Sequence, residues 1–407
     1  MRCSLYTDNV SSVAISSRAK VVPAVSDSQD AAVDSRAGEL AEQIVQRLRS
    51  MGPTGWERMA VTFALTADQS MARVVFTIGD RSAQFAADSV TVHLARQQRE
   101  LTAKWDSGPW WRMILRARPG GEVGIEYDDG RYPFPEGWLF TPQAYEADLA
   151  AYPRERLPVW LGAYLRHGGR QQRIPQRAAA DGRSDAEHGV RPTDSTGLLP
   201  EPTVLWERWA LLAAVFVAEG SPLGPRILPS LGVFEGATSR SGSTLYILPG
   251  GRAVLSGGVW DAPELAAAYN GGGKLPNLYA GAPNWVANSV LNPRAGTGLL
   301  SFCYWHDGRC WYRGESPVPD EFAQAVPGVG DTDILNTLIL QRVAAEPTAT
   351  HRDSVAALVA VAESRKVTRD HLEVLFGGEF ADIDGALYQL EIAGLTPASA
   401  KPRRRRK

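Results

Sequence analysis

Three residues in the last third of the chain are of types that bind metal ions: Cys303, His306 and Cys310. Zinc needs four ligands that converge as a tetrahedron, or three ligands and a water molecule. The segment LLSFCYWHDGRCWYRGE (299–315) predicts a hairpin with Asp-Gly at the centre of its turn, so His306 would lie at the turn and the cysteines along the strands. We therefore expect no metal site here. We also expect no disulfide, because Cys303 would face Tyr312 across the hairpin.

The other candidates for catalysis are incomplete motifs. The serine-rich TSRSGST (238–244) lacks the Gly-x-Ser-x-Gly pattern of a nucleophile elbow. In YNGGGKLPN (269–277), Leu275 follows the lysine where a phosphate-binding loop has Ser or Thr. The sequence thus predicts no catalytic residue and no cofactor. An enzyme with polar groups gathered around Ser241–Ser243, Lys274 or His306 stays open as the least favoured alternative.

Aromatic and basic side chains surround two Asp-Gly-Arg segments and suggest a binding surface. In WWRMILRAR (110–118), large apolar residues alternate with Arg112, Ile114 and Arg116, so one face of this strand is basic. Exposed aromatic patches are typical of partner sites, although the same rings could instead pack a core. The candidate partner-binding residues are Trp110, Arg112, Arg116, Asp128, Arg131, Trp305, His306, Arg309 and Trp311.

The elements that would position these residues alternate between helical and strand periodicity. Leu40, Ile44, Val45 and Leu48 form the stripe of an amphipathic helix that ends near Met51. Further helices are predicted at 89–104, 142–151, 204–219, 262–269 and 319–325, with three or four more over 331–395, where Thr368 and Asp382 are expected N-caps. Strands are predicted at 56–65, 72–79 and 110–118, and hairpins at 243–258 and at both Asp-Gly-Arg segments.

This pattern predicts an α+β fold of two small helix-plus-antiparallel-sheet units followed by a C-terminal helical subdomain. The expected boundaries are a disordered arm at 1–36, a first domain at 37–166, a linker at 167–202, a second domain at 203–328, the helical subdomain at 329–395 and a basic tail at 396–407. The segments at 122–138 and 299–315 suggest that the two units are divergent copies. The alternative is that two common Asp-Gly turns coincide by chance.

Charge and composition limit the classes of partner. The formal net charge is −2, yet the last seven residues, KPRRRRK, carry six positive charges, so the rest of the chain is acidic. A broad, specific nucleic-acid surface is therefore not expected. No apolar run approaches the ~18 residues of a membrane span, and the first residues lack the apolar core of a secretory signal. We expect a cytoplasmic protein, and the sequence leaves its oligomeric state open.

Residues 37–165 resemble the YezG-like superfamily of antitoxin and immunity proteins. The likeness lies in Gly55-Trp56-Glu57, the strand at Trp111-Arg112-Met113, the hairpin at Gly121–Asp128 and the closing YPRERLPVWL at 152–161. It implies a compact α+β protein that binds and blocks a secreted toxin domain without a cofactor. The whole chain, rich in Ala, Arg and Gly, is also similar to conserved proteins of mycobacteria and related actinobacteria, which implies no activity.

The resemblance and the incomplete catalytic motifs together predict a non-catalytic protein-binding protein of the immunity class. Its partner would be a toxin domain. The alternative is an adaptor or chaperone of a secretion system that holds a secreted helical client, because a helical subdomain follows the two α+β units.

Overall fold

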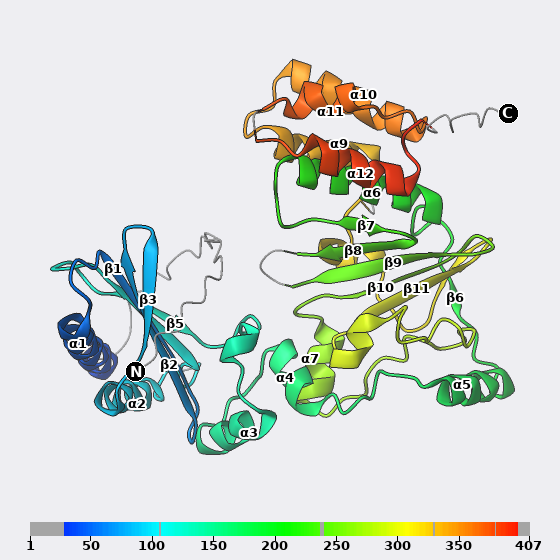
Figure 1. Cartoon of the computed structure of the whole chain (residues 1–407). Coiled ribbons are helices and arrows are strands. Elements are labelled where there is room, and N and C mark those ends of the chain that lie inside the picture. Colours follow the sequence, from blue (N-terminus) through cyan, green and yellow to red (C-terminus); the bar gives the residue numbers. More distant parts are fainter. Residues whose placement is uncertain (1–27, 106, 237–239, 329, 379, 398–407) are drawn as a thin grey trace, which may run out of the picture. The chain divides into compact units, whose positions relative to one another are not determined.

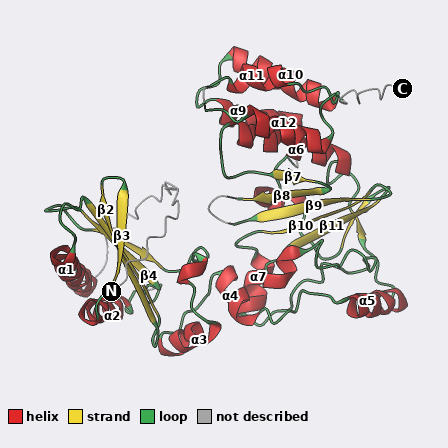
Figure 2. Cartoon of the chain, viewed as in Figure 1, coloured by secondary structure: helices red, strands yellow, loops and turns green. Residues whose placement is uncertain are grey.

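The computed structural model describes residues 28–105, 107–236, 240–328, 330–378 and 380–397. They divide into two compact units (Figure 1). The first contains the residues up to Gly130 together with Pro135–Arg154, and the second contains Arg131–Phe134 together with everything from Glu155. Helices and antiparallel strands make up both units (Figure 2), which confirms the α+β class and the helical C-terminal region.

The first unit is a five-stranded antiparallel sheet in the order β3-β2-β1-β4-β5. Its strands are β1 Arg58–Leu65, β2 Ser70–Ile78, β3 Arg81–Ala86, β4 Arg112–Ala117 and β5 Gly124–Asp128. Its helices are α1 Ser28–Met51, α2 Ser89–Thr102, the short η1 Glu136–Trp138 and α3 Pro142–Ala151.

The core of the first unit lies between the sheet and the helices α1 and α2. The predicted stripe of α1 is buried, with Ile44 and Val45 fully inaccessible, and it packs with alternate residues of β1 such as Val61 and Phe63. Asp88 begins α2 by accepting a hydrogen bond from the Thr91 amide at 2.8 Å. Only one face of this sheet is therefore used for the core.

The second unit contains a seven-stranded antiparallel sheet in the order β6-β12-β11-β10-β9-β8-β7. The strands are β6 Thr193–Asp194, β7 Arg226–Leu228, β8 Leu231–Glu235, β9 Gly242–Leu248, β10 Arg252–Gly258, β11 Phe302–Asp307 and β12 Trp311–Arg313. The helices up to the last strand are α4 Val159–Arg166, α5 Pro175–Glu187, α6 Pro202–Ala218, α7 Pro263–Asn270 and η2 Pro293–Thr297. After it come α8 Pro319–Phe322, η3 Ala323–Ala325, α9 Thr332–Val343, α10 Ala349–Glu363, α11 Arg369–Phe376 and α12 Ile383–Ala393.

Both faces of this second sheet are covered. Phe302 and Tyr304 point into one core together with α6 and the C-terminal helices. Cys303 and Trp305 point to the opposite face, where they pack with apolar residues between Leu278 and Leu300. Alternate aromatic residues of β11 therefore face opposite ways, and a second layer rather than solvent covers them.

Several sequence-based boundaries need correction. The arm predicted at 1–36 is helical from Ser28, while residues 1–27 and the end of the basic tail lie outside the described residues. The first domain closes at Arg154 rather than at 166, because α4 packs against α7 in the second unit. The helical subdomain is not separate either, because α9–α12 share the hydrophobic core that contains α6.

The predicted linker at 167–202 is an integral part of the second unit. It contains α5, and its strand β6 pairs with β12. Gln171 is buried, and its side-chain amide bonds both ways with the backbone of Leu300, donating to the carbonyl at 2.6 Å and accepting from the N–H at 3.0 Å. The arginines and prolines of this segment suggested a linker, but the pairing of β6 with β12 and the hydrogen bonds of Gln171 to Leu300 fix it within the second unit.

The two units are connected differently, which argues against the predicted duplication. In the first unit, β4 follows α2 and pairs with β1, the first of the three strands that precede that helix. In the second unit, β11 follows α7 and pairs with β10, the last of the strands β7–β10 that precede that helix. The first Asp-Gly-Arg segment does not form the expected hairpin, because β5 pairs with β4 and Arg131–Phe134 belongs to the second unit.

No helix in the described parts of the chain is both long enough and apolar enough to cross a membrane.

Candidate functional site

The cysteine and histidine candidates lie inside the second unit. The β11–β12 hairpin pairs His306 with Trp311 and Trp305 with Tyr312, so Tyr312 faces Trp305, two residues along β11 from Cys303, its predicted partner. The reason is that Gly308, with φ of 106°, takes the first central position of the turn instead of the second.

His306 is held by the backbone through one ring nitrogen, and a carboxylate lies near the other without a hydrogen bond. Its Nδ1 lies 2.9 Å from the carbonyl oxygen of Gly251, and its Nε2 lies 3.5 Å from Oε2 of Glu201. Cys303 is fully buried, burial raises the pKa of its thiol far above the usual range, and the thiol donates to Asn292. Among the described residues, no three His, Cys, Asp or Glu side chains gather around a possible metal position.

The serine and lysine candidates for the enzyme alternative do not converge either. The hydroxyl of Ser241 accepts from the Trp260 amide at 3.1 Å, and that of Ser243 donates to the Ala325 carbonyl at 2.5 Å. Lys274 is exposed on the loop after α7. Both described hydroxyls are therefore committed to backbone bonds within the unit.

Four of the predicted partner-binding residues are buried, so their assignment to a surface is wrong. Trp110, Trp305 and Trp311 are each 1% exposed, and His306 is 4% exposed. The rings fill cores: the indole of Trp110 donates to Gln98, for example, at 2.5 Å. Large aromatic side chains stabilise a core by burying much apolar surface, and sequence alone does not separate this use from a binding patch.

The remaining five predicted residues reach the surface. Arg131 and Arg309 are exposed in the second unit, where the guanidinium of Arg131 lies 5.7 Å from the ring centre of Trp260. Arg112, Arg116 and Asp128 lie together in the first unit on neighbouring strands β4 and β5. These last three belong to one continuous surface.

That surface, here called the outer face, is the side of the first sheet opposite α1 and α2. Strand alternation puts every second residue of each strand on it. Its centre is small or apolar, and charged residues surround it: Ala60, Thr62, Ala64, Val75 and Ile114 in the middle, with Arg58, Arg73, Arg112, Arg116, Glu126 and Asp128 around them. None of the central residues except Ala64 is fully buried.

The charges of the outer face are partly paired. Arg116 lies 2.6 Å from Glu126 across the β4–β5 ladder, and Arg112 lies 3.3 Å from Asp128. Burial raises the pKa of Asp128, against the opposing effects of a hydrogen bond from Gly130 and the charge of Arg112. With four arginines against two carboxylates, the face is cationic overall and suits an acidic partner.

Sequence reasoning missed part of the outer face. Arg73 on β2 and Trp138 in η1 belong to it, with the Arg73 guanidinium 5.1 Å from the ring centre of Trp138 and that of Arg112 6.0 Å from the same ring. The available signal was SMARVVFTI (70–78), where Arg73, Val75 and Thr77 alternate with buried Val74 and Phe76. Trp138 offered no periodicity because it lies outside any strand.

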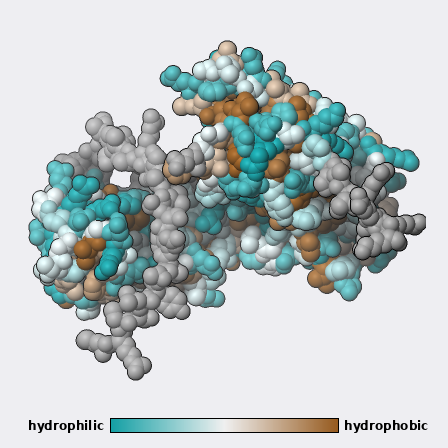
Figure 3. All heavy atoms as spheres, turned by 45° about the horizontal axis from the view of Figure 1, so that its top comes forward, coloured by the Kyte–Doolittle hydropathy of each residue, from teal (hydrophilic) through white to brown (hydrophobic). Residues whose placement is uncertain are grey.

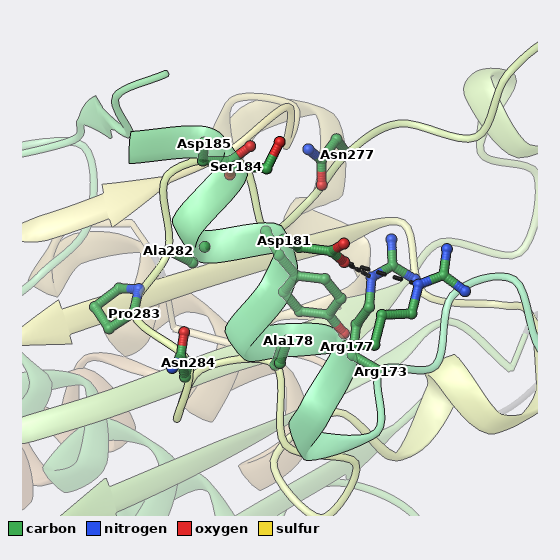
Figure 4. A pocket seen from close by; sticks show the side chains of 13 residues that line it. Arg173, Arg177, Ala178, Asp181, Ser184, Asp185, Asn277, Ala282, Pro283 and Asn284 are labelled. Atoms are coloured by element: carbon green, nitrogen blue, oxygen red, sulfur yellow. Dashed lines mark ion pairs between the residues drawn. The ribbon is translucent and has the colours of Figure 1, made fainter. Parts of the chain in front are cut away.

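A polar hollow of about 210 Å³ lies in the second unit between α5 and the turns over residues 277–287. Figure 4 shows the guanidinium groups of Arg173 and Arg177 beside Asp181, whose carboxylate is 2.9 Å from Arg173 and 3.8 Å from Arg177. Asp185 accepts from the Gly281 amide at 2.8 Å. The carboxylates of Asp181 and Asp185 are thus bonded to other groups of the second unit. None of the predicted site residues lines the hollow.

No protein-family model matches the chain, and no curated protein matches it. The functional interpretation therefore depends on the geometry of the outer face.

Proposed function

We propose that the chain is a non-catalytic binding protein of the immunity class, which binds an acidic surface of a toxin domain with its outer face. The observation that supports this is the single-sided first sheet. Helices α1 and α2 bury one face, while the opposite face presents a strip of small side chains with a mainly cationic surround. An apolar centre with a polar, solvent-accessible rim is a common composition for a protein interface.

The resemblance of residues 37–165 to YezG-like immunity proteins supports the same class of function. The proposed compartment is the cytoplasm, and the free thiols of Cys303 and Cys310 agree with a reducing environment. The partner's acidic residues would meet Arg58, Arg73 and Arg116, which are exposed on β1, β2 and β4.

Calorimetry with toxin domains encoded by neighbouring genes tests this proposal. We expect a complex at micromolar concentration or tighter. The double variant Arg58→Glu/Arg116→Glu should weaken it by roughly tenfold or more, which corresponds to about 1.4 kcal/mol. Arg116 forms only an exposed ion pair, so the fold should tolerate this change.

Arg352→Glu on α10 is the matched control, because Arg352 is exposed on a helix of the second unit. It should leave the affinity unchanged. The absence of a complex with every candidate toxin domain would remove the immunity proposal. Equal weakening by both variants would remove the outer face as its site.

A second candidate function, the adaptor for a helical client, has its own observation. Large apolar side chains of the C-terminal helical region are exposed: Ile334 at 50%, Val374 at 71%, Phe380 at 93% and Tyr388 at 59%. Figure 3, in which the helical end of this unit comes forward, shows apolar surface there. Co-purification of a secreted helical protein that is lost in Val374→Ser/Phe380→Ser would favour the adaptor over the immunity protein.

A further inference from the structure

Strand β3 is an edge strand that lacks the usual protection against pairing. Exposed edges normally carry charges, proline, bulges or a cover, because their unpaired backbone groups can accept another strand. From Ser82 to Ala86 this strand has neither charge nor proline, and it pairs residue by residue with β2 without a bulge. Five of its six residues are exposed.

The other three sheet edges in the described chain are all protected. β5 carries Glu126 and Asp128, and β6 has only two residues. β7 has three, and its Ile227 amide donates to the side chain of Gln389 on α12 at 2.7 Å. β3 is therefore the exception among the four edges.

The turn before β3 determines which backbone groups point outwards. Gly79 and Asp80 form a two-residue loop, with Gly79 at φ of 55°, so Ile78 and Arg81 form a hydrogen-bonded pair. Such pairs alternate along the ladder. The N–H and C=O groups of Ser82, Gln84 and Ala86 then point away from β2, and no backbone bond to another described segment involves them.

The side chains show where the hydrophobic core extends to this edge. Trp56 and Phe76 are 5.4 Å apart in an edge-to-face contact, and Phe76 and Phe85 are 5.8 Å apart in another. Phe76 is buried, whereas Phe85 is 44% exposed at the end of this aromatic row. A further strand beside β3 would cover it.

We propose that β3 pairs antiparallel with β3 of a second copy of this chain, which joins two five-stranded sheets about a twofold axis at Gln84. In this register Ser82 faces Ala86 of the second copy and Gln84 faces Gln84, so all three outward residues are paired with one another. Phe85 then faces the small side chain of Ala83 in a closely spaced, non-hydrogen-bonded pair. Arg81 meets no like charge, because its counterpart is Ala87. The strand is thus complementary to itself, as a twofold interface requires.

Sedimentation velocity of the full chain under reducing conditions, over a range of micromolar concentrations, tests the dimer. We expect a concentration-dependent species of twice the chain's mass. Gln84→Pro should abolish it by removing an outward N–H, while its ladder to β2 stays intact because that N–H does not point to β2. Gln84→Ala keeps the N–H and is the matched control, so it should still dimerise.

Hydrogen exchange on the same samples identifies the interface. Amides of Ser82, Gln84 and Ala86 should become protected as the concentration rises, whereas those of Ala83 and Phe85, which bond to β2, should be protected throughout. A single chain mass at all concentrations overturns the proposal. A dimer that persists in Gln84→Pro, with these outward amides exchanging freely, also overturns it.

Discussion

The most demanding test of the first unit concerns an ion pair buried within it. Arg99 on α2 and Asp148 on α3 are 4% and 0% exposed, with 2.8 Å between Nη2 and Oδ2. The same carboxylate oxygen accepts from the indole N–H of Trp111 at 2.7 Å, and Arg99 Nε donates to the Trp110 carbonyl at 2.7 Å. These bonds join α2 and α3 to the residues at the start of β4.

A third charged group, Arg154, makes the effect of removing Arg99 different from the effect of removing Asp148. The guanidinium of Arg154 lies 3.6 Å from the ring centre of Trp111, and burial lowers its pKa to about 10, with Asp148 opposing that shift. If Arg99 is removed, Arg154 still partly compensates the carboxylate. If Asp148 is removed, the buried guanidinium of Arg99 and the half-buried guanidinium of Arg154 are left without it, and the Trp111 N–H loses its acceptor.

Breaking a buried pair from one side costs about 3–5 kcal/mol. We therefore expect Arg99→Met to lower the free energy of unfolding of this unit by about 3 kcal/mol and Asp148→Leu by about 5 kcal/mol. The double variant should be about as unstable as Asp148→Leu alone, because the second substitution removes one of the two cations that Asp148→Leu leaves without a counter-charge and so adds no further cost. This implies a coupling of about 3 kcal/mol.

Hydrogen exchange of core amides in β1 and β4 is the appropriate assay, because it reports the opening of this unit, whereas a melt of a two-unit chain need not be two-state. Arg36→Met is the control, since its pair with Glu39 is more than half exposed on both sides and should contribute less than about 1 kcal/mol. If the effects of the two buried substitutions add within about 0.5 kcal/mol, the charges are not coupled and the explanation is wrong.

Three further outcomes are expected. Gly258→Ala should destabilise the second unit by about 1–3 kcal/mol, measured by chemical unfolding, because a Cβ there would clash with the carbonyl oxygen of Leu299. Gln171→Leu should cost about 1–3 kcal/mol for each backbone group of Leu300 left unsatisfied, and an unchanged unfolding midpoint would restore the linker interpretation. Hydrogen bonds from Arg47 and Thr91 hold the pKa of the Asp88 carboxyl below its usual value. The stabilisation by this carboxylate is therefore present above pH ~4 and is lost as the pH falls further. The unfolding midpoint of Asp88→Asn should accordingly decline less with acid than that of the parent chain.

The sequence predicted elements where one periodicity dominated. The buried stripe and the end of α1 and the hairpin of β9 and β10 were predicted correctly, although α1 begins at Ser28, inside the predicted arm. Both expected N-caps, Thr368 and Asp382, begin helices. β3 was missed because an edge strand with little to bury shows no alternation of apolar residues. α5 was missed because most of its residues are exposed and only Ala178 is buried, so no apolar stripe marks it.

The site was harder to predict because burial depends on the tertiary structure. Asp-Gly occurs in both segments, yet the first forms no hairpin: the Asp128 side chain accepts from the Gly130 amide, and the chain then leaves the sheet. Phe134 packs instead with Trp160 of the second unit, 5.1 Å between ring centres. The residues that favour a turn are present in the sequence, but packing against residues distant in the sequence determines where the chain continues after Gly130.

The two proposed interfaces of the first unit can be separated because they use different groups. The outer face would bind through side chains of β1, β2 and β4, whereas the edge would pair through backbone groups of β3. Charge reversal at Arg58 and Arg116 should therefore leave the dimer intact, since neither residue belongs to β3. Gln84→Pro should leave toxin affinity per chain unchanged, since it removes no charge. If Gln84→Pro abolished toxin binding together with the dimer, the two surfaces would be coupled, and the partner would bind only a sheet already joined to its copy.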